Sequence, residues 1–322
     1  MPSPAQAAAL TAGEVFAGRS VSENGPATCN TSNTSSSSNS AFTSDGVTVT
    51  QIASGTTHLD DTLDASDTVD FTTSTTSRVR ATESAGQLRT VDIDATLTGS
   101  FVAAQGLATD CDASAQLSTQ FTFQTVLSAS RWVTLDAVLP PGATAQLIIQ
   151  RTMPTTPVVQ EIVILTGTQK GRAQAQVLLP AGAYVAQGIV ATTYASPQTA
   201  GDPTSFSYKP HVHVDYLDAG VAKDTAEGDG TAYARFKDVR DCATNQLKGK
   251  FLKAAGTKAE PTLKKAIFKV NGVKSKVVKK AKKGGRITLK NLPAGEDVLV
   301  TATFKLKGGG KKSFSREYYS CT

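Results

Sequence analysis

Short segments in which apolar and polar residues alternate follow one another along this chain, and no other feature limits its possible folds as strongly. A period of two residues is typical of a β-strand that buries one face and exposes the other. Glycine and proline separate the segments, and signals of helices are scarce. The sequence therefore predicts an all-β protein. The first ten expected strands are 46–52, 68–73, 89–101, 116–127, 131–139, 143–151, 160–167, 172–179, 183–194 and 205–217.

Two kinds of turn support this prediction. Leu-Pro-(Pro/Ala)-Gly occurs at 139–142, 179–182 and 292–295, where proline presets φ and glycine closes a type I turn. Asn271 and Gly272 lie between two alternating segments and are typical of a type I′ hairpin. About ten strands without helices predict a jelly-roll-like β-sandwich, and about seven shorter strands after them predict a smaller immunoglobulin-like β-sandwich.

Charge divides the chain at the same place. Residues 1–234 contain 10 Lys and Arg against 21 Asp and Glu, a net −11, whereas residues 235–322 contain 23 against 6, a net +17. A reversal this sharp favours two separately folded domains. We expect the jelly-roll-like sandwich over 14–217, a linker without periodicity over 218–234, and the basic immunoglobulin-like sandwich over 235–322.

Two further segments carry no alternating pattern that could form a core. Residues 30–40, which are all Ser, Thr or Asn, predict a flexible loop. The segment 1–13 lacks the basic and long apolar regions of a signal peptide, but Ala5-Gln6-Ala7 has the form of a cleavage site. We expect either a signal-peptide remnant or a disordered tail there. No apolar run is long enough for a transmembrane segment.

The four cysteines also fall two in each part of the chain. None belongs to a Cys-x-x-Cys or Cys-x-x-His cluster, which argues against a zinc site. The simplest of the three pairings joins Cys29 to Cys111 and Cys242 to Cys321. Paired structural cysteines are typical of an oxidising compartment, so we expect a secreted or extracellular protein, with cell-wall association as an option. Four buried free thiols in a cytosolic protein are the alternative.

Two stretches resemble known families. "TVDIDATLTGSF" and "LLPAGAYVAQGIVATTYASPQTAGDPTSFSYKPHVHVDY" resemble the exported jelly-roll domains of bacterial choice-of-anchor surface proteins, which pass from a similar turn into a last aromatic-rich strand. "RDCATNQLKGKF" and "NLPAGEDVLVTATFKLKGGGKKSFSREYYSCT" are similar to lysine-rich C-terminal Ig-like domains of exported actinobacterial proteins. The resemblance implies export and two sandwiches, and neither family brings a catalytic residue with it.

Three residues of the last strand before the expected linker have the types and spacing of metal ligands. His211, His213 and Asp215 alternate along the strand, so their side chains share a face about 6.5–7 Å apart. The residues between them, Val212 and Val214, continue a core-facing stripe. We favour the interpretation that the histidines form the solvated face of a strand, with a metal site as the alternative.

A run of aspartates suggests calcium as a second metal. Asp60, Asp61 and Asp64 begin the run, and Asp67 and Asp70 continue it. Calcium prefers carboxylate oxygens, but the spacing is not that of an EF-hand loop, and solvated acidic turns are common. A structural calcium is the only cofactor that we consider.

The basic domain suggests contact with an anionic envelope polymer, whereas solubility or a weak surface contact is the simpler interpretation of its lysines. Nineteen of its 23 basic residues are lysines, and a lysine-rich face attracts anionic polymers without selecting among them. Specific nucleic-acid readers depend more on arginine and stacking aromatics, so we expect no specific nucleic-acid partner. The candidate contact residues are Lys274, Lys276, Lys279, Lys280, Lys282 and Lys283.

No motif of a catalytic nucleophile, a zinc protease or a phosphate-binding loop occurs in the sequence. We therefore expect a non-enzymatic adhesion or interaction protein of the cell envelope, whose basic domain contacts anionic envelope polymers. The alternative is a carbohydrate-binding module centred on the jelly roll, whose binding either does or does not depend on calcium. A metal-dependent enzyme that uses His211, His213 and Asp215 is a third hypothesis.

Overall fold

The computed structural model describes residues 10–25, 28–106, 109–139, 143–152, 160–161, 171–197, 199, 202–252, 263–279, 281, 284–307 and 309–322. Every regular element over these residues is a β-strand, so the all-β prediction is confirmed. No helix in this part of the chain is long and apolar enough to cross a membrane. The chain forms two compact units, one of Met1–Ala129 with Val133–Tyr216, the other of Ser130–Trp132 with Leu217–Thr322.

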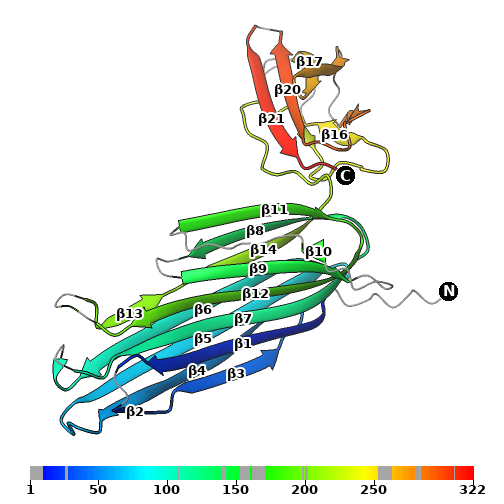
Figure 1. Cartoon of the computed structure of the whole chain (residues 1–322). Coiled ribbons are helices and arrows are strands. Elements are labelled where there is room, and N and C mark those ends of the chain that lie inside the picture. Colours follow the sequence, from blue (N-terminus) through cyan, green and yellow to red (C-terminus); the bar gives the residue numbers. More distant parts are fainter. Residues whose placement is uncertain are drawn as a thin grey trace. The chain divides into compact units, whose positions relative to one another are not determined.

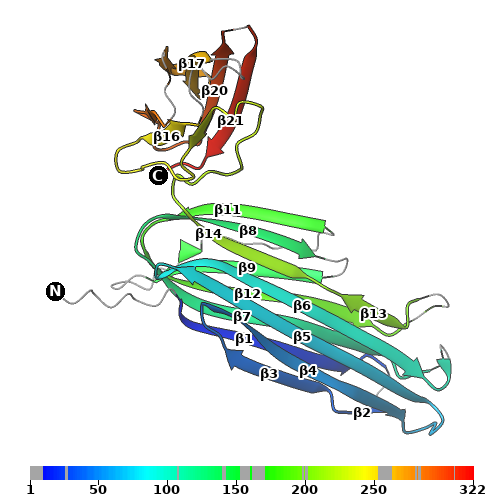
Figure 2. The ribbon, with the colours of Figure 1, turned by 180° about the vertical axis from the view of Figure 1, so that it is seen from behind.

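Two antiparallel sheets face each other in the first unit (Figures 1 and 2). We name them sheet A, with the order β10-β9-β12-β7-β1-β3, and sheet B, with the order β11-β8-β14-β6-β5-β4-β2. The short strand β13 also pairs with β6 of sheet B. Sheet A contains β1 (Leu10–Glu23), β3 (Ser35–Ala41), β7 (Ala113–Leu127), β9 (Ala143–Thr152), β10 (Gln160–Glu161) and β12 (Gly182–Ala195). Sheet B contains β2 (Cys29–Ser32), β4 (Asp45–Asp61), β5 (Thr68–Ser84), β6 (Gln87–Ala103), β8 (Arg131–Leu139), β11 (Gly171–Leu179), β13 (Ser205–Tyr208) and β14 (His211–Asp218).

The strand order identifies the winding of this sandwich. The strands from β6 to β14, with the short β13 left out, form nested pairs of neighbours. These pairs are β6 with β14, β7 with β12, β8 with β11 and β9 with β10. These nested pairs are divided between the two sheets, which is the winding of a jelly roll, and the predicted fold class is confirmed. The earlier strands widen it: β1 and β3 extend sheet A, and β5, β4 and β2 extend sheet B.

Alternation along the strands builds the core between the two sheets. In β14, Val212, Val214 and Tyr216 are buried, and the residues between them are partly exposed. In β7, Phe121 and Phe123 belong to the same buried cluster. Each inward side chain of this kind removes apolar surface from water, and each outward one stays available on a face.

The Ser/Thr/Asn-rich segment differs from the expected loop. Residues Ser35–Ala41 form β3, which pairs with β1 in unbroken register from Glu14↔Ala41 to Ser20↔Ser35. Backbone hydrogen bonds need no apolar side chains, so a polar segment can form an edge strand beside a well-anchored neighbour. The N-terminal expectation also changes, because Leu10–Gly13 belong to β1, whereas residues 1–9 lie outside the described residues.

The second unit is a smaller sandwich. Its two sheets have the orders β15-β16-β19 and β18-β17-β20-β21, so its first, second and fifth strands face the other four, as in immunoglobulin-like sandwiches. The strands are β15 (Ala234–Phe236), β16 (Leu247–Phe251), β17 (Leu263–Val270), β18 (Val273–Val278), β19 (Arg286–Leu289), β20 (Val298–Leu306) and β21 (Lys311–Tyr318).

The expected linker 218–234 belongs to this second unit. Ala222 forms a β-bridge with Tyr318, and Glu227 forms one with Ser315. The absence of periodicity was a poor guide here, because isolated bridges satisfy the backbone without an alternating pattern. The segment is therefore part of the second sandwich rather than a free connection.

Each unit contains one disulfide. Cys29 is bonded to Cys111 in the first unit and Cys242 to Cys321 in the second. In the second unit the Leu-Pro-Ala-Gly turn has a structural role, because the carbonyls of Pro293 and Ala294 accept hydrogen bonds from the buried guanidinium of Arg240. The expected strand 160–167 is described only at Gln160–Glu161, and Pro140–Gly142 of the first such turn also lie outside the described residues.

Candidate functional site

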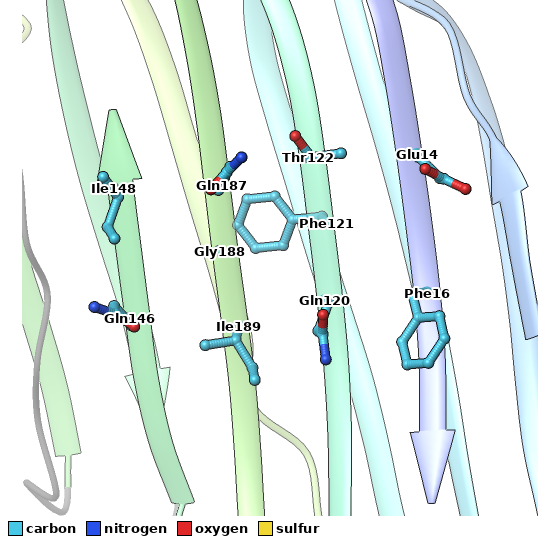
Figure 3. Close-up of a pocket in the computed structure, with 10 residues that line it drawn as sticks. All are labelled: Glu14, Phe16, Gln120, Phe121, Thr122, Gln146, Ile148, Gln187, Gly188 and Ile189. Atoms are coloured by element: carbon cyan, nitrogen blue, oxygen red, sulfur yellow. The ribbon is translucent and has the colours of Figure 1, made fainter. Parts of the chain in front are cut away.

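The outer face of sheet A carries an ordered pattern of amide and apolar side chains. The strand register places Gln146 beside Ile189, Ile189 beside Gln120, and Gln120 beside Phe16, which makes one row across four strands. A second row runs Ile148, Gln187, Thr122 and Glu14 across the same strands. Amides and apolar groups therefore alternate along both directions over much of this face (Figure 3).

A shallow groove lies over these two rows. It encloses about 470 Å³, and its wall includes all eight residues of the two rows. Gln120, Gln146, Gln187 and Glu14 are exposed, whereas Phe16, Ile148 and Ile189 are partly buried. We call these eight residues the amide face: Glu14, Phe16, Gln120, Thr122, Gln146, Ile148, Gln187 and Ile189.

A glycine beneath the groove controls its floor. Gly188 pairs with Phe121, whose ring lies across it (Figure 3). A Cβ at Gly188 would lie 2.1 Å from Cζ of Phe121, which no real contact allows. Phe121 is 4% exposed, so the ring fills the core at the position that a side chain of residue 188 would occupy. Gly99 and Phe206 repeat this arrangement in sheet B.

The amides of this face are available to a ligand. No hydrogen bond within the described residues occupies the side-chain amides of Gln120, Gln146 or Gln187. Glu14 is the one charged member of the amide face, and its Oε1 accepts a hydrogen bond of 2.5 Å from the amide of Asn39. Each free glutamine amide offers two N–H donors and a carbonyl acceptor. The amide face can therefore donate and accept hydrogen bonds without carrying much charge.

The outer face of sheet B has a different chemistry, and it holds the predicted metal ligands. His211 and His213 lie there as expected, with Asp92 and Asp94 of β6 as their register partners. His211 Nδ1 lies 2.7 Å from Asp94 Oδ1, and His213 Nδ1 lies 2.5 Å from Asp92 Oδ1.

Asp215 is not the third member of the group that the structure brings together. The atoms close enough to share a metal belong to Asp92, His211 and His213, whereas Asp215 lies 3.0 Å from the other ring nitrogen of His213. Sequence spacing could not show this, because Asp92 comes from a strand more than 100 residues earlier. Aspartate carboxylates already pair with both imidazole rings. The histidines are therefore explained without a metal, as members of a ladder of His–Asp pairs on the solvated face of the sheet.

These pairs affect the proton affinity of the histidines. Burial opposes the charge on His213, but the hydrogen bond to Asp92 and the charges of Asp215 and Asp92 outweigh it, so the pKa of His213 is raised. The hydrogen bond to Asp70 likewise raises the pKa of His58 on β4, which also pairs with Asp60. All three histidines thus have aspartate partners.

The structure separates the three aspartates expected to bind calcium. Asp60 faces outward and pairs with His58 at 2.7 Å. Asp64 lies in the exposed turn after β4, where Ser66 and Gln105 donate hydrogen bonds to its carboxylate. Only Asp61 points inward, because successive residues of a strand alternate between faces. It meets Asp67 and Asp110, which were not among the three candidates.

The predicted polyanion contacts lie only partly within the described residues. Lys274 and Lys279 are exposed on or beside β18, and Lys276 donates a hydrogen bond to the carbonyl of Thr288. Lys280, Lys282 and Lys283 lie outside the described residues.

A different sheet of the second unit gathers more positive charge than β18. Arg235, Lys250 and Arg286 are direct neighbours across β15, β16 and β19. With Lys237 and Lys248 they line a groove of about 950 Å³, which we call the basic groove. Like charges opposite one another destabilise a sheet. Arg235 gains only a distant contact, 3.8 Å, with Asp238.

Sequence reasoning missed both the amide face and the basic groove. The signal for the first was present in the spacing of glutamines: Gln116, Gln120 and Gln124 of β7 lie four residues apart and so share a face. Gln146 and Gln150 repeat that spacing in β9. The neighbouring strands that complete the pattern could not be known without the sheet order.

No known family model matches the sequence, and no curated protein matches it. The solved structures that match it include the following three. The adhesin domain of Epf from Streptococcus pyogenes is 10% identical, with 94% of this chain and 91% of that chain covered and a TM-score of 0.23. A carbohydrate-binding module of the β-sandwich superfamily is 11% identical, with 65% and 86% covered and a TM-score of 0.21.

The third is the Spr0440 glycoside hydrolase domain, Endo-D, from Streptococcus pneumoniae R6. It is 9% identical, with 66% of this chain and 34% of that chain covered and a TM-score of 0.18. At these TM-scores none of the three likenesses carries an argument about function.

Proposed function

We propose that the protein is a non-enzymatic, secreted or envelope-associated binding protein whose amide face binds a neutral glycan. The observation that carries this proposal is the alternation of free amides with Ile148, Ile189 and Phe16 over one groove. A sugar ring presents hydroxyl groups at its rim and C–H groups on its faces. Amides match the first and apolar side chains the second.

The electrostatics of the groove favour a neutral ligand. Glu14 is the one charged side chain among the eight, and it already accepts a hydrogen bond from Asn39. An anionic ligand would find no positive partner in the amide face. The groove also lies in the middle of sheet A, where β12, β7 and β1 already pair on both sides, so an extended peptide could not join these three strands at this point.

A glycan array tests this proposal. The full chain should be retained on neutral oligosaccharides, and the double variant Gln120→Ala/Gln187→Ala should lose that retention. The control Thr96→Ala/Thr98→Ala changes two partly exposed residues on the outer face of sheet B and should leave retention unchanged. Retention that is equal for native chain and double variant would contradict the assignment to the amide face.

The histidine and cysteine contacts support the non-enzymatic part of the proposal. Within the described ranges the hydrogen bonds of the three histidine rings go to aspartates, and the four cysteines form disulfides. A serine or cysteine nucleophile needs a base within hydrogen-bond reach. Disulfides persist in oxidising compartments, and the resemblance to exported surface proteins agrees with a position outside the cytosol.

The basic groove supports a second function for the second unit, contact with an anionic envelope polymer. Three cations in register across three strands repel one another, and a bound polyanion would neutralise them. The proposed contact therefore includes Arg235, Lys250 and Arg286 in addition to the lysines near β18.

Retention on immobilised anionic wall polymer tests this second function. Native chain should be retained at low salt and released at high salt, because screening weakens charge interactions between exposed groups. Lys250→Gln/Arg286→Gln should be released at lower salt than native chain, whereas Lys305→Gln/Lys307→Gln, outside the groove, should shift release less. Retention that does not respond to salt would contradict the electrostatic contact.

A further inference from the structure

Three aspartates meet next to the disulfide of the first unit, in a place that the proposed function does not use. Asp61 ends β4 and is the register partner of Cys29, whereas Asp110 directly precedes Cys111. Asp67 lies just before β5. One carboxylate oxygen from each of the three lies within 4.8 Å of the others. The turn after β4 and the segment before β7 therefore contribute ligands to one point.

Two of these carboxylates are removed from water. Asp61 is 7% exposed and Asp67 is 3% exposed, whereas Asp110 is open to solvent. Asp67 Oδ2 accepts a hydrogen bond of 2.8 Å from the backbone N–H of Asp110. Its other oxygen, Oδ1, is buried and has no hydrogen-bond partner among the residues that the structure describes. A buried carboxylate oxygen without a partner is costly and calls for a bound positive group.

The protein itself supplies no such group within the described residues. None of the ion pairs found there involves Asp61, Asp67 or Asp110. Three neighbouring carboxylates without a basic partner repel one another, and the repulsion is strongest where burial weakens screening by water.

We propose that Asp61, Asp67 and Asp110 bind a calcium ion. All three ligands are carboxylates, which favours a hard cation over zinc or copper. Calcium accepts six to eight oxygens in a flexible geometry, so peptide oxygens and water can complete the shell. Magnesium demands a near-ideal octahedron and usually takes only one or two carboxylates, so it suits this group less.

The ion would brace a turn against the disulfide. Asp61 and Asp67 enclose residues 62–66, and the backbone N–H of Asp61 donates to the carbonyl of Asp67 at 3.1 Å. Asp61 Oδ1 also accepts a hydrogen bond from the backbone of Leu63. Calcium would tie this turn to the segment that carries Cys111, which gives the site a structural role and no part in binding the glycan.

Calorimetry of the full chain tests the site. The thermal transition of the first unit should shift upward by about 3–10 °C in 10 mM calcium relative to EDTA, as expected for a dissociation constant of about 0.1–1 mM. The transition of the second unit, which contains none of these residues, should not move. Isothermal titration should give about one calcium per chain, with magnesium at least tenfold weaker.

Two variants locate the site. Asp67→Asn keeps the shape and an acceptor for the N–H of Asp110 but removes one charge, so it should lose most of the calcium-dependent shift. In EDTA it should melt at or above the temperature of the native chain, because neutralising one carboxylate relieves repulsion. Asp64→Asn is the matched control, since Asp64 is exposed in the same turn and, over the described part of the chain, belongs to neither group of possible metal ligands.

Two results would overturn the proposal. One is the absence of both a thermal shift and calorimetric heat at 10 mM calcium. The other is a shift that is as large in Asp67→Asn as in the native chain, which would place the ion elsewhere. Neither result bears on the amide face, which the glycan array tests separately.

Discussion

The two outer faces of the first sandwich arise from the same alternation and share one core, yet they differ in what they leave available. Sheet B places His211, His213 and their aspartate partners in a ladder whose members satisfy one another across strands. Sheet A places amides beside apolar groups, and the amides of Gln120 and Gln187 have no partner within the described residues. One face is closed by its own pairings, and the other is open.

This difference teaches where to look for a site on a β-sandwich. Titratable residues are conspicuous in a sequence, but on sheet B the histidines and aspartates pair with one another. The uncharged glutamines of sheet A are less conspicuous and more available. If the two faces function independently, changes on sheet A should affect glycan binding and changes on sheet B should not.

A charge introduced into the open face should have the largest effect. Ile189→Glu places a carboxylate in the groove that a bound glycan would have to desolvate, and it should weaken glycan binding by about 100-fold or more. Ile52→Glu is the matched change on the outer face of sheet B, where Ile52 is 56% exposed, and should leave binding within about twofold. Titration calorimetry measures both. Similar losses in the two variants would mean that the faces are not distinct.

The floor of the groove should be sensitive to added volume. Gly188→Ala forces the ring of Phe121 from its place and should lower the free energy of unfolding of the first unit by about 1–3 kcal/mol. Gly99→Ala beneath Phe206 should cost a similar amount in sheet B. Denaturant unfolding provides the comparison, and only Gly188→Ala should also weaken glycan binding. A fully stable Gly188→Ala would show that the ring is free to move aside.

Breaking the ladder should have a smaller effect that does not reach the open face. Asp92→Asn removes a charge that faces His213 and should lower the free energy of unfolding by about 0.5–1 kcal/mol. Glycan binding should not change. If binding fell together with stability in this variant, the closed face would have to contribute to the site.

The smallest effect concerns pH. Because the pKa of His213 is raised in the folded chain, its stabilising contribution is fully present below the unfolded value of 6.5 and is lost as pH rises through the folded value. Denaturant unfolding of the first unit should show that its free energy of unfolding falls by less than about 1 kcal/mol between pH 6 and 8.5. His213→Gln should reduce this slope, with His58 accounting for a remaining part. An unchanged slope would remove His213 as its source.

The architecture could be predicted from the sequence because alternation is a local property. The alternating pattern alone identifies Val212, Val214 and Tyr216 as the buried face of β14, and all three are buried. The nested strand order could not be derived, because it depends on pairings such as Asp92 with His213 over more than 100 residues. For the same reason Asp61 was placed among calcium candidates, whereas Asp110, distant in sequence, was missed.

Two polar segments also have a structure that differs from the one predicted from the sequence. β3 consists of Ser, Asn and Ala, and it pairs with β1 through its backbone, with one side-chain hydrogen bond from Asn39 to Glu14. Residues 218–234 are held by isolated bridges to the second sandwich. Neither segment has an alternating apolar pattern, so the sequence did not predict that its backbone pairs with a sandwich.

Binding of a neutral oligosaccharide by two single variants of β7 tests the central proposal most directly. Gln120 and Gln116 lie four residues apart on the same face, but only Gln120 lines the groove. Titration calorimetry should show that Gln120→Ala weakens binding by about tenfold, the usual effect of losing one or two hydrogen bonds to a ligand, whereas Gln116→Ala binds as the native chain does. Equal affinities for the two variants would contradict a glycan site on the amide face.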